Sequence, residues 1–289
     1  MISFSALTID TFAQDIIEIQ PLFEYPSAPE ELATLEEKSD YLVEHFWDSM
    51  DFKSKSTVDQ NALNDAFKVF SVPLRWANRD KAIAATNKLL QTISKNPTLL
   101  LQFTKAAEET IYGPRAEVWV DEVYLKFLNT LVSNKKIPAQ RKKKYEDQLK
   151  VLSNALVGNV APEFKFEGLD GREATYFPMT TVTIIIFGDP RDTDWRISRL
   201  RMESNAALTD ALDKGKINIL YILPNKLDNW KNEVSGYSSK WTVGCGDKLN
   251  EIYDMRATPS VYLIGSDGKI LLKNTTLNMA VNKAFEQLK

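Results

Sequence analysis

The sequence predicts an all-helical domain followed by a domain in which β-strands alternate with helices. Two observations lead to this fold class. From Pro29 to about Asn154 the apolar residues recur at helical spacing, and glycine is almost absent. After Gly158, runs rich in β-branched residues alternate with helical segments, which is typical of a sheet covered by helices. The length of 289 residues fits two hydrophobic cores, because one domain usually holds roughly 100–200 residues.

The helical domain is expected to span residues 29–154 and to contain six helices joined by short turns. Thr57 and Asp59 are candidate caps of the second helix, and Gly113-Pro114 ends the fourth. The predicted helices lie within residues 33–50, 57–74, 78–96, 98–113, 116–134 and 139–158. Four aromatic residues are expected in the core of this domain, with a groove for a partner as the alternative: Trp47, Trp76, Trp119 and Tyr124.

Residues 1–28 are interpreted as an N-terminal arm. The segment is apolar and reaches the small residue Ala13, as the end of an export signal does. However, no Lys or Arg stands at its start, and Asp10 interrupts the apolar run. A truncated signal and a short unstructured arm therefore remain the two alternatives. No stretch approaches the roughly 18 apolar residues of a membrane-spanning helix, so no transmembrane segment is predicted.

The second domain is expected to cover residues 155–289. Residues 181–188 and 216–223 are continuous apolar runs of the kind found in central strands that are buried on both faces. Residues 260–274 contain a Ser-Asp-Gly turn between two apolar runs, which predicts a hairpin. One helix is expected between the first two strands and another after the hairpin, toward the C-terminus. The resulting order is strand, helix, strand, hairpin and closing helix.

Two motifs in this domain resemble a known family. "GNVAPEFKFEGLDGREATYF" is similar to the lead-in of extracytoplasmic thioredoxin-like and peroxiredoxin-like proteins, and "YDMRATPSVYLIGSDGKILLKN" is similar to their second hallmark. The resemblance covers about Gly158 to Lys289 and implies a thioredoxin-like fold in which the Thr258-Pro259 bond is cis beside the active site. "YLVEHFWDSMDF" and "NALVGNVAPEFKF" resemble a helical domain that precedes such modules in envelope proteins of some Gram-negative bacteria. A periplasmic or cell-envelope location follows from this likeness.

The sequence departs from the family at its redox motif. There the first strand of the βαβ unit ends in Asp-Pro-x-Cys-x-x-Cys, whereas this chain has "DPRDTDW". Asp189 and Pro190 match, but Asp192 and Trp195 stand at the two cysteine positions. Thiol–disulfide exchange needs an attacking thiolate and a second thiol that resolves the mixed disulfide. We therefore expect no catalytic residues at this turn, where Asp192 becomes an anion at a helix start.

The composition excludes most other kinds of catalytic and metal-binding site. The single cysteine, Cys245, and the single histidine, His45, exclude a disulfide within the chain and the usual multi-ligand zinc sites. We expect no metal and no cofactor. A net charge of −3 gives no sign of a nucleic-acid partner. Cys245 lies between two glycines, on what reads as a flexible turn. We expect an unreactive thiol, because Asp247 acts against a thiolate, and a reactive monothiol exposed on that turn is the alternative.

Three functions stay open at this point. The first is a non-catalytic module that binds a protein or peptide partner of unknown identity in the cleft beside the cis-proline, since strand pairing there needs no thiol. The candidate binding residues are Asp189, Pro190, Trp195, Thr258 and Pro259. The second is a peroxide-reactive or mixed-disulfide monothiol protein that uses Cys245. The third is a scaffold with neither activity. Dithiol oxidoreductase activity is not expected, because both cysteines of the motif are replaced.

Overall fold

The computed structural model describes residues 21–53, 56–178 and 180–289. Its N-terminal part is all-helical, as predicted, and Asp59 caps the second helix by accepting a hydrogen bond from the Ala62 backbone N–H. Pro97 begins the fourth helix, where a residue without a free N–H is well tolerated. The helices are α1 (Leu35–His45), α2 (Gln60–Leu74), α3 (Arg79–Ile93), α4 (Pro97–Ile111), α5 (Asp121–Ser133) and α6 (Ala139–Asn154).

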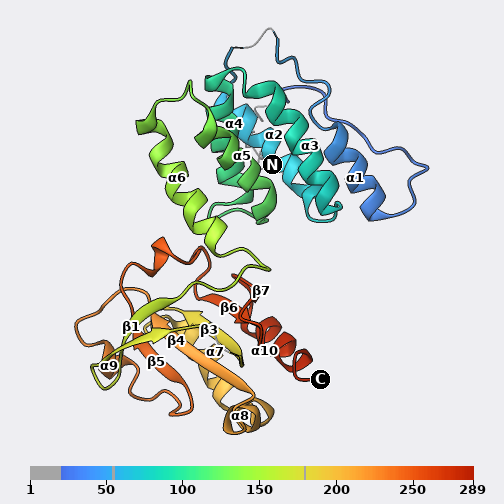
Figure 1. Ribbon diagram of the computed structural model, residues 1–289. Helices are drawn as coiled ribbons and strands as arrows, with labels where there is room; N and C mark the ends of the chain where they lie inside the picture. The colour runs from blue at the N-terminus through green and yellow to red at the C-terminus, as the bar shows by residue number, and fades with distance from the viewer. Residues whose placement is uncertain (1–20, 54–55, 179) are drawn as a thin grey trace, which may run out of the picture.

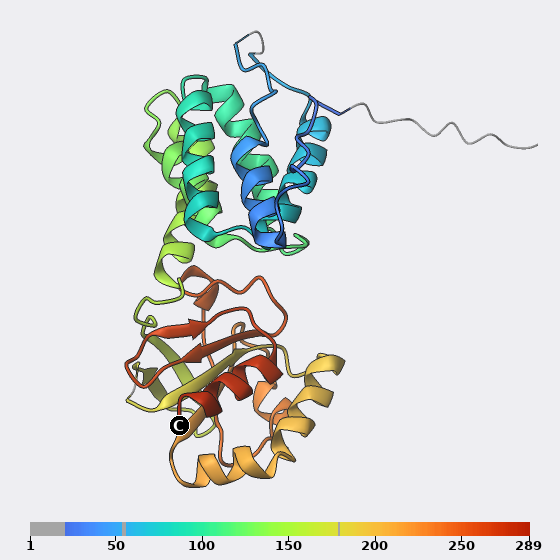
Figure 2. The same ribbon diagram turned by 90° about the vertical axis from the view of Figure 1, so that its right-hand side faces the viewer.

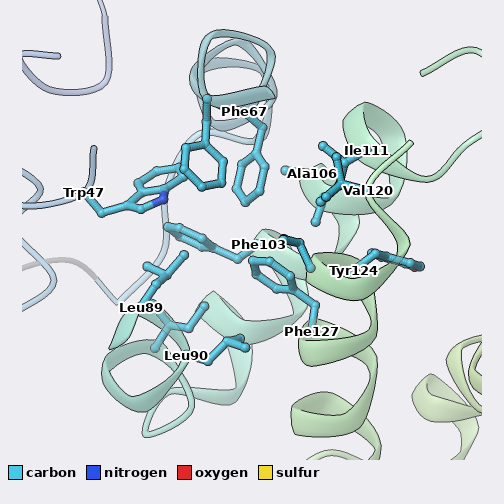
Figure 3. Packing of buried hydrophobic residues seen from close by; sticks show 14 of the residues in the cluster. Trp47, Phe67, Leu89, Leu90, Phe103, Ala106, Ile111, Val120, Tyr124 and Phe127 are labelled. Carbon is cyan, nitrogen blue, oxygen red and sulfur yellow. The ribbon is translucent and has the colours of Figure 1, made fainter. Parts of the chain in front are cut away.

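Aromatic rings fill the centre of this helical domain (Figure 3). Phe67 of α2 lies 5.8 Å from Phe103 of α4 and 5.9 Å from Phe127 of α5, measured between ring centroids. Trp47 and Tyr124 belong to the same core, as expected. The expectation for Trp76 was wrong. Its side chain is 56% exposed, because it follows the last turn of α2 on the solvent side.

The predicted N-terminal arm lies mostly outside the described residues, which begin at residue 21. Its described end packs against the helical domain. Phe23 lies 5.6 Å from the ring of Phe46 and 5.4 Å from that of Trp47, and Tyr25 stacks on Phe46 at 5.2 Å. Residues 21–28 therefore extend the helical core at α1.

In the C-terminal part, the described strands form one seven-stranded sheet with strand order β2-β1-β5-β4-β3-β6-β7. The strands are β1 (Phe164–Gly168), β2 (Glu173–Tyr176), β3 (Val182–Phe187), β4 (Ile217–Leu223), β5 (Thr242–Cys245), β6 (Ser260–Ile264) and β7 (Ile270–Leu272). Strands β3, β4 and β5 are parallel to one another, and β6 runs antiparallel to β3. All six residues of β3 are buried, as its continuous apolar run predicts.

The helices described in this domain are α7 (Thr193–Glu203), α8 (Ala206–Asp213), α9 (Trp230–Glu233), the 3₁₀ helix η1 (Leu249–Glu251) and α10 (Leu277–Glu286). The single helix expected between β3 and β4 is two helices, because Asn205 caps α8 directly after α7 ends. The hairpin of β6 and β7 is confirmed. Strands β1, β2 and β5 and the short helix α9 are described elements that the sequence did not predict.

The two domains are stacked end to end (Figures 1 and 2). Helix α6 leads down from the helical domain into the sheet domain, and the segment after β5 lies at the top of the sheet domain, facing the helices. Among the described helices, none is both long and apolar enough to cross a membrane.

Strand β5 supplies a stability prediction, because Gly244 lies in close contact with β1. A Cβ atom at this position would overlap the ring of Phe166 and lie 2.9 Å from the Glu167 carbonyl oxygen. We expect Gly244→Ala to lower the free energy of unfolding by about 1–3 kcal/mol, as overpacking does. Gly236→Ala is the matched control, since a Cβ there meets nothing within 4 Å. Urea denaturation of both variants checks the prediction, and equal stability would contradict it.

Candidate functional site

The Thr258–Pro259 peptide bond is cis, the isomer that the resemblance implies. Pro259 lies against the end of β3, since a Cβ at Gly188 would be 3.3 Å from the Pro259 Cβ. Thr258 is exposed. Within the described residues, neither its backbone N–H nor its carbonyl oxygen has a hydrogen-bond partner in the protein. The backbone N–H and carbonyl oxygen of this exposed residue therefore have no partner among the described residues.

A cleft of about 560 Å³ opens beside this bond. Its walls come from α7, from the start of α10, from residues 257–259 and from Trp119 of the helical domain. Helix α7 contributes Asp194, Ser198 and Arg201, which lie on one face because they are spaced by four and three residues. The cleft is therefore bordered by polar side chains on α7 and by an aromatic ring from the other domain.

The turn that carries the redox motif in the resembling family is here a capped helix start. Asp192 is the N-cap of α7, and its Oδ1 accepts a hydrogen bond of 2.7 Å from the Trp195 backbone N–H. Asp189 forms an ion pair with Arg191, whose hydrogen bonds lower the pKa of the Asp189 carboxyl. Pro190 is buried. The carboxylates of Asp189 and Asp192 are thus bound to groups of the turn itself, and the buried Pro190 cannot contact a ligand.

The expectation that Trp195 contacts a ligand was wrong. Its side chain is completely buried. The indole stacks on Tyr221 of β4 with ring centroids 4.9 Å apart, and its Nε1–H donates a 2.7 Å hydrogen bond to the Tyr237 hydroxyl. Because an indole has a large apolar surface, it packs beneath α7 instead of facing the cleft. The residue at the second cysteine position is a core residue.

Cys245 does not lie on an exposed turn, which corrects the expectation from its neighbouring glycines. It ends β5, pairs in register with Glu167 of β1 and Leu223 of β4, and is 4% exposed. Burial raises the pKa of the thiol, and the positive charge of Lys226 offsets this only in part. A neutral and inaccessible thiol is a poor nucleophile.

We expect native Cys245 to react with a thiol reagent such as DTNB at least roughly a hundredfold more slowly than the unfolded chain, because reaction requires local opening of β5. The measurement compares labelling with and without concentrated guanidinium chloride, with Cys245→Ser as the blank. Rapid and complete labelling of the folded protein would contradict the burial described above and would favour the monothiol alternative.

A buried ion-pair cluster joins the two domains beside the cleft, and sequence reasoning missed it. Arg256 Nη2 lies 2.6 Å from Asp121 Oδ1 at the start of α5 and also pairs with Asp254. Lys273 Nζ lies 2.7 Å from Asp121 and 2.8 Å from Asp254. The side chain of Asp254 is only 1% exposed. Two acids and two bases therefore neutralise one another at the domain interface.

Arg256 also binds the loop between α4 and α5. Its Nη1 donates a 2.7 Å hydrogen bond to the Tyr112 carbonyl oxygen. The guanidinium lies over two rings, 4.2 Å from the centroid of Tyr112 and 4.9 Å from that of Trp119. Because Arg256 precedes Thr258 by two residues, these contacts hold the cis-proline segment against the helical domain. Asp121 is more than 130 residues away in sequence from the other three charged residues, so no local pattern revealed the cluster.

A family of proteins containing a domain of unknown function, DUF5106, matches residues 5–155. The chain belongs to this family. The DUF5106 region thus includes the helical domain, with Trp119 lining the cleft and Asp121 in the ion-pair cluster. A search of curated proteins finds no match.

Solved structures are similar to the DUF5106 chain in fold. A thioredoxin-like protein from Bacteroides caccae is 19% identical, covers 91% of this chain and 98% of its own, and has a TM-score of 0.76. A conserved protein of unknown function from Bacteroides fragilis is 21% identical over 45% of this chain and 98% of its own, with a TM-score of 0.42. The thioredoxin domain of a thiol-disulfide oxidoreductase from Bacteroides vulgatus is 18% identical over 46% and 99%, with a TM-score of 0.40. The first likeness confirms the predicted fold class, a helical domain followed by a thioredoxin-like domain.

Proposed function

We propose that this protein is a non-catalytic binding module whose cleft beside Thr258–Pro259 takes up an extended segment of a polypeptide partner. The observation that carries the proposal is the unpaired backbone of Thr258 at the border of a 560 Å³ cleft. A peptide that lies along this segment pairs with the N–H and the carbonyl oxygen of Thr258, as an added strand does. Such pairing uses backbone groups and works for many sequences.

The chemistry of the site favours binding over thiol exchange. The two positions of the family's cysteines hold a carboxylate that caps α7 and an indole that fills the core. The remaining thiol, Cys245, lies in β5 and is not among the residues that line the cleft. No described side chain at the cleft can form a mixed disulfide with a substrate. The labelling experiment on Cys245 tests the monothiol alternative: slow labelling of the folded protein counts against it, and rapid labelling favours it.

We also propose a location in the periplasm or elsewhere in the cell envelope. The support is the resemblance of both the lead-in segment and the Thr258-Pro259 segment to extracytoplasmic modules. Cell fractionation with an antibody against the protein tests this proposal. Recovery of the protein in the envelope or periplasmic fraction is expected, and recovery with cytoplasmic markers alone would overturn it.

A displayed library of random peptides without cysteine tests the proposed function. The wild-type chain is expected to enrich peptides, and Ser198→Trp is expected to abolish their binding, because Ser198 lines the cleft and an indole would fill it. Ile197→Trp is the matched control, since Ile197 is 47% exposed on α7 and does not line the cleft. Failure to enrich any peptide, or equal binding by both variants, would overturn the proposal.

A further inference from the structure

One wall of the cleft comes from outside the thioredoxin-like domain. Trp119 lies in the loop between α4 and α5 and is half-buried. Its Nε1–H donates a 2.9 Å hydrogen bond to the Gly113 carbonyl oxygen, and the Arg256 guanidinium lies over its ring. The indole is therefore held in place by its own loop and by the domain interface. Its remaining exposed surface borders the cleft together with Thr258 and Pro259.

Asn274 is another of the residues that line the cleft, and its amide is unpaired. Both its Oδ1 and its Nδ2 are buried and have no hydrogen-bond partner among the described residues. Its φ of 47° is in the left-handed region, which Asn tolerates better than most residues. Lys273, the preceding residue, belongs to the ion-pair cluster, and Thr275, the following one, bonds to Val261 of β6. The contacts of Lys273 and Thr275 thus hold the backbone on both sides of Asn274 in place.

A buried amide without a partner is unfavourable, and native proteins rarely leave one unsatisfied. Its one acceptor and its donor pair complement a peptide group, which offers one N–H and one carbonyl oxygen. The indole of Trp119 offers a flat apolar surface, which suits an aliphatic or aromatic side chain. Together with the free backbone of Thr258, the cleft presents main-chain partners and one apolar contact.

We infer that the helical domain sets the sequence preference of the cleft, with Trp119 contacting one apolar side chain of the bound polypeptide and Asn274 pairing with a peptide group beside it. This inference rests on the proposed function. It means that the DUF5106 region takes part in recognition, because Trp119 of this region forms one wall of the cleft. The Asp121–Arg256 ion pair, at 2.6 Å, is the contact that positions this wall.

Selection from the same displayed library tests the role of Trp119. Peptides enriched by the wild-type chain are expected to share an apolar residue at one position. Trp119→Ala is expected to enrich peptides without that preference, whereas Trp119→Phe keeps it. Trp76→Ala is the control, because Trp76 is exposed just after the end of α2 and does not line the cleft. An unchanged preference in Trp119→Ala would overturn the inference and leave the proposed function standing, while the absence of any enriched peptide would overturn both.

A second measurement does not depend on the folding of Trp119→Ala. The wild-type chain is labelled with 5-fluorotryptophan, and Trp119→Phe and Trp76→Phe assign the two resonances. Addition of an enriched peptide is expected to shift the Trp119 resonance and to leave that of Trp76 unchanged. A peptide that binds without moving the Trp119 resonance would overturn the inference.

Asn274→Gly tests the amide. Glycine adopts the left-handed conformation freely and removes the unpaired group, so the melting temperature is expected to stay the same or to rise. Peptide affinity, by contrast, is expected to fall about tenfold, which is the effect of losing one or two hydrogen bonds. Affinity equal to that of the wild type would overturn the role given to Asn274.

Discussion

Arg256→Met is expected to lower the free energy of unfolding by about 3–5 kcal/mol, because it leaves a buried carboxylate without its main partner. Asp254 is 1% exposed and would retain only Lys273, and Asp121 would lose its contact with the cis-proline segment. The methionine keeps most of the apolar volume, so the loss reports on charge and hydrogen bonding. Urea denaturation measures the change.

Lys165→Met is the control for this prediction. Lys165 and Glu173 form an ion pair of 2.8 Å whose side chains are 68% and 66% exposed. Removing an exposed pair costs about 0–1 kcal/mol, because water screens both charges. If Arg256→Met were no more destabilising than Lys165→Met, the cluster would be a solvated contact and would not hold the domains together.

The same cluster gives a pH dependence. Burial by itself raises the pKa of Asp254, but hydrogen bonds from Arg256 and the charge of Lys273 more than offset it, so the pKa lies below its usual value. A carboxyl whose pKa is lowered by folding stabilises the protein above the pKa of the unfolded chain, about 3.9, and this contribution is lost as the pH falls further. We therefore expect the difference in stability between wild type and Arg256→Met to shrink below about pH 4.

Trp195→Ala is expected to cost about 3–5 kcal/mol, the usual loss for a large aromatic residue in a core. The change removes the stacking on Tyr221 and leaves the Tyr237 hydroxyl without its donor. Trp195→Phe should cost less, because a ring remains against Tyr221. Trp76→Ala, at a side chain that is 56% exposed, should change stability by about 0.5 kcal/mol or less.

Thermal melts of these three variants provide the check. A loss for Trp195→Ala as small as that for Trp76→Ala would mean that the indole does not support the sheet. The expected large loss has a further consequence for the redox motif. Position 195 serves core packing in this chain, so a cysteine there would remove a large core side chain.

Much of the fold could be predicted because its signals are local. The apolar run of β3 and the Ser-Asp-Gly turn before β7 each determine an element without distant partners. Strand β5 was missed because it has four residues, one of them Gly244, and glycine usually marks a turn. Its place between β1 and β4 depends on close packing against Phe166, which no sequence pattern displays.

The candidate site was predictable only in part. The motif comparison located the cleft at Thr258-Pro259, where the structure has an open site. The motif comparison placed Trp195 at the cleft, whereas its side chain is buried in the core. A position in a motif does not show whether the side chain there faces the core or the solvent. Trp119 and Asn274 were not assigned to the site, because they come together only when the two domains pack.

The most direct test of thiol-independent binding is amide hydrogen exchange at Thr258, followed by NMR in the Cys245→Ser chain with and without a peptide enriched from the cysteine-free library. In the free protein this N–H has no partner within the described residues and should exchange rapidly. We predict that peptide binding slows its exchange, because the peptide carbonyl accepts a hydrogen bond from Thr258. A bound peptide that leaves the exchange rate at Thr258 unchanged would contradict strand pairing at the cis-proline cleft.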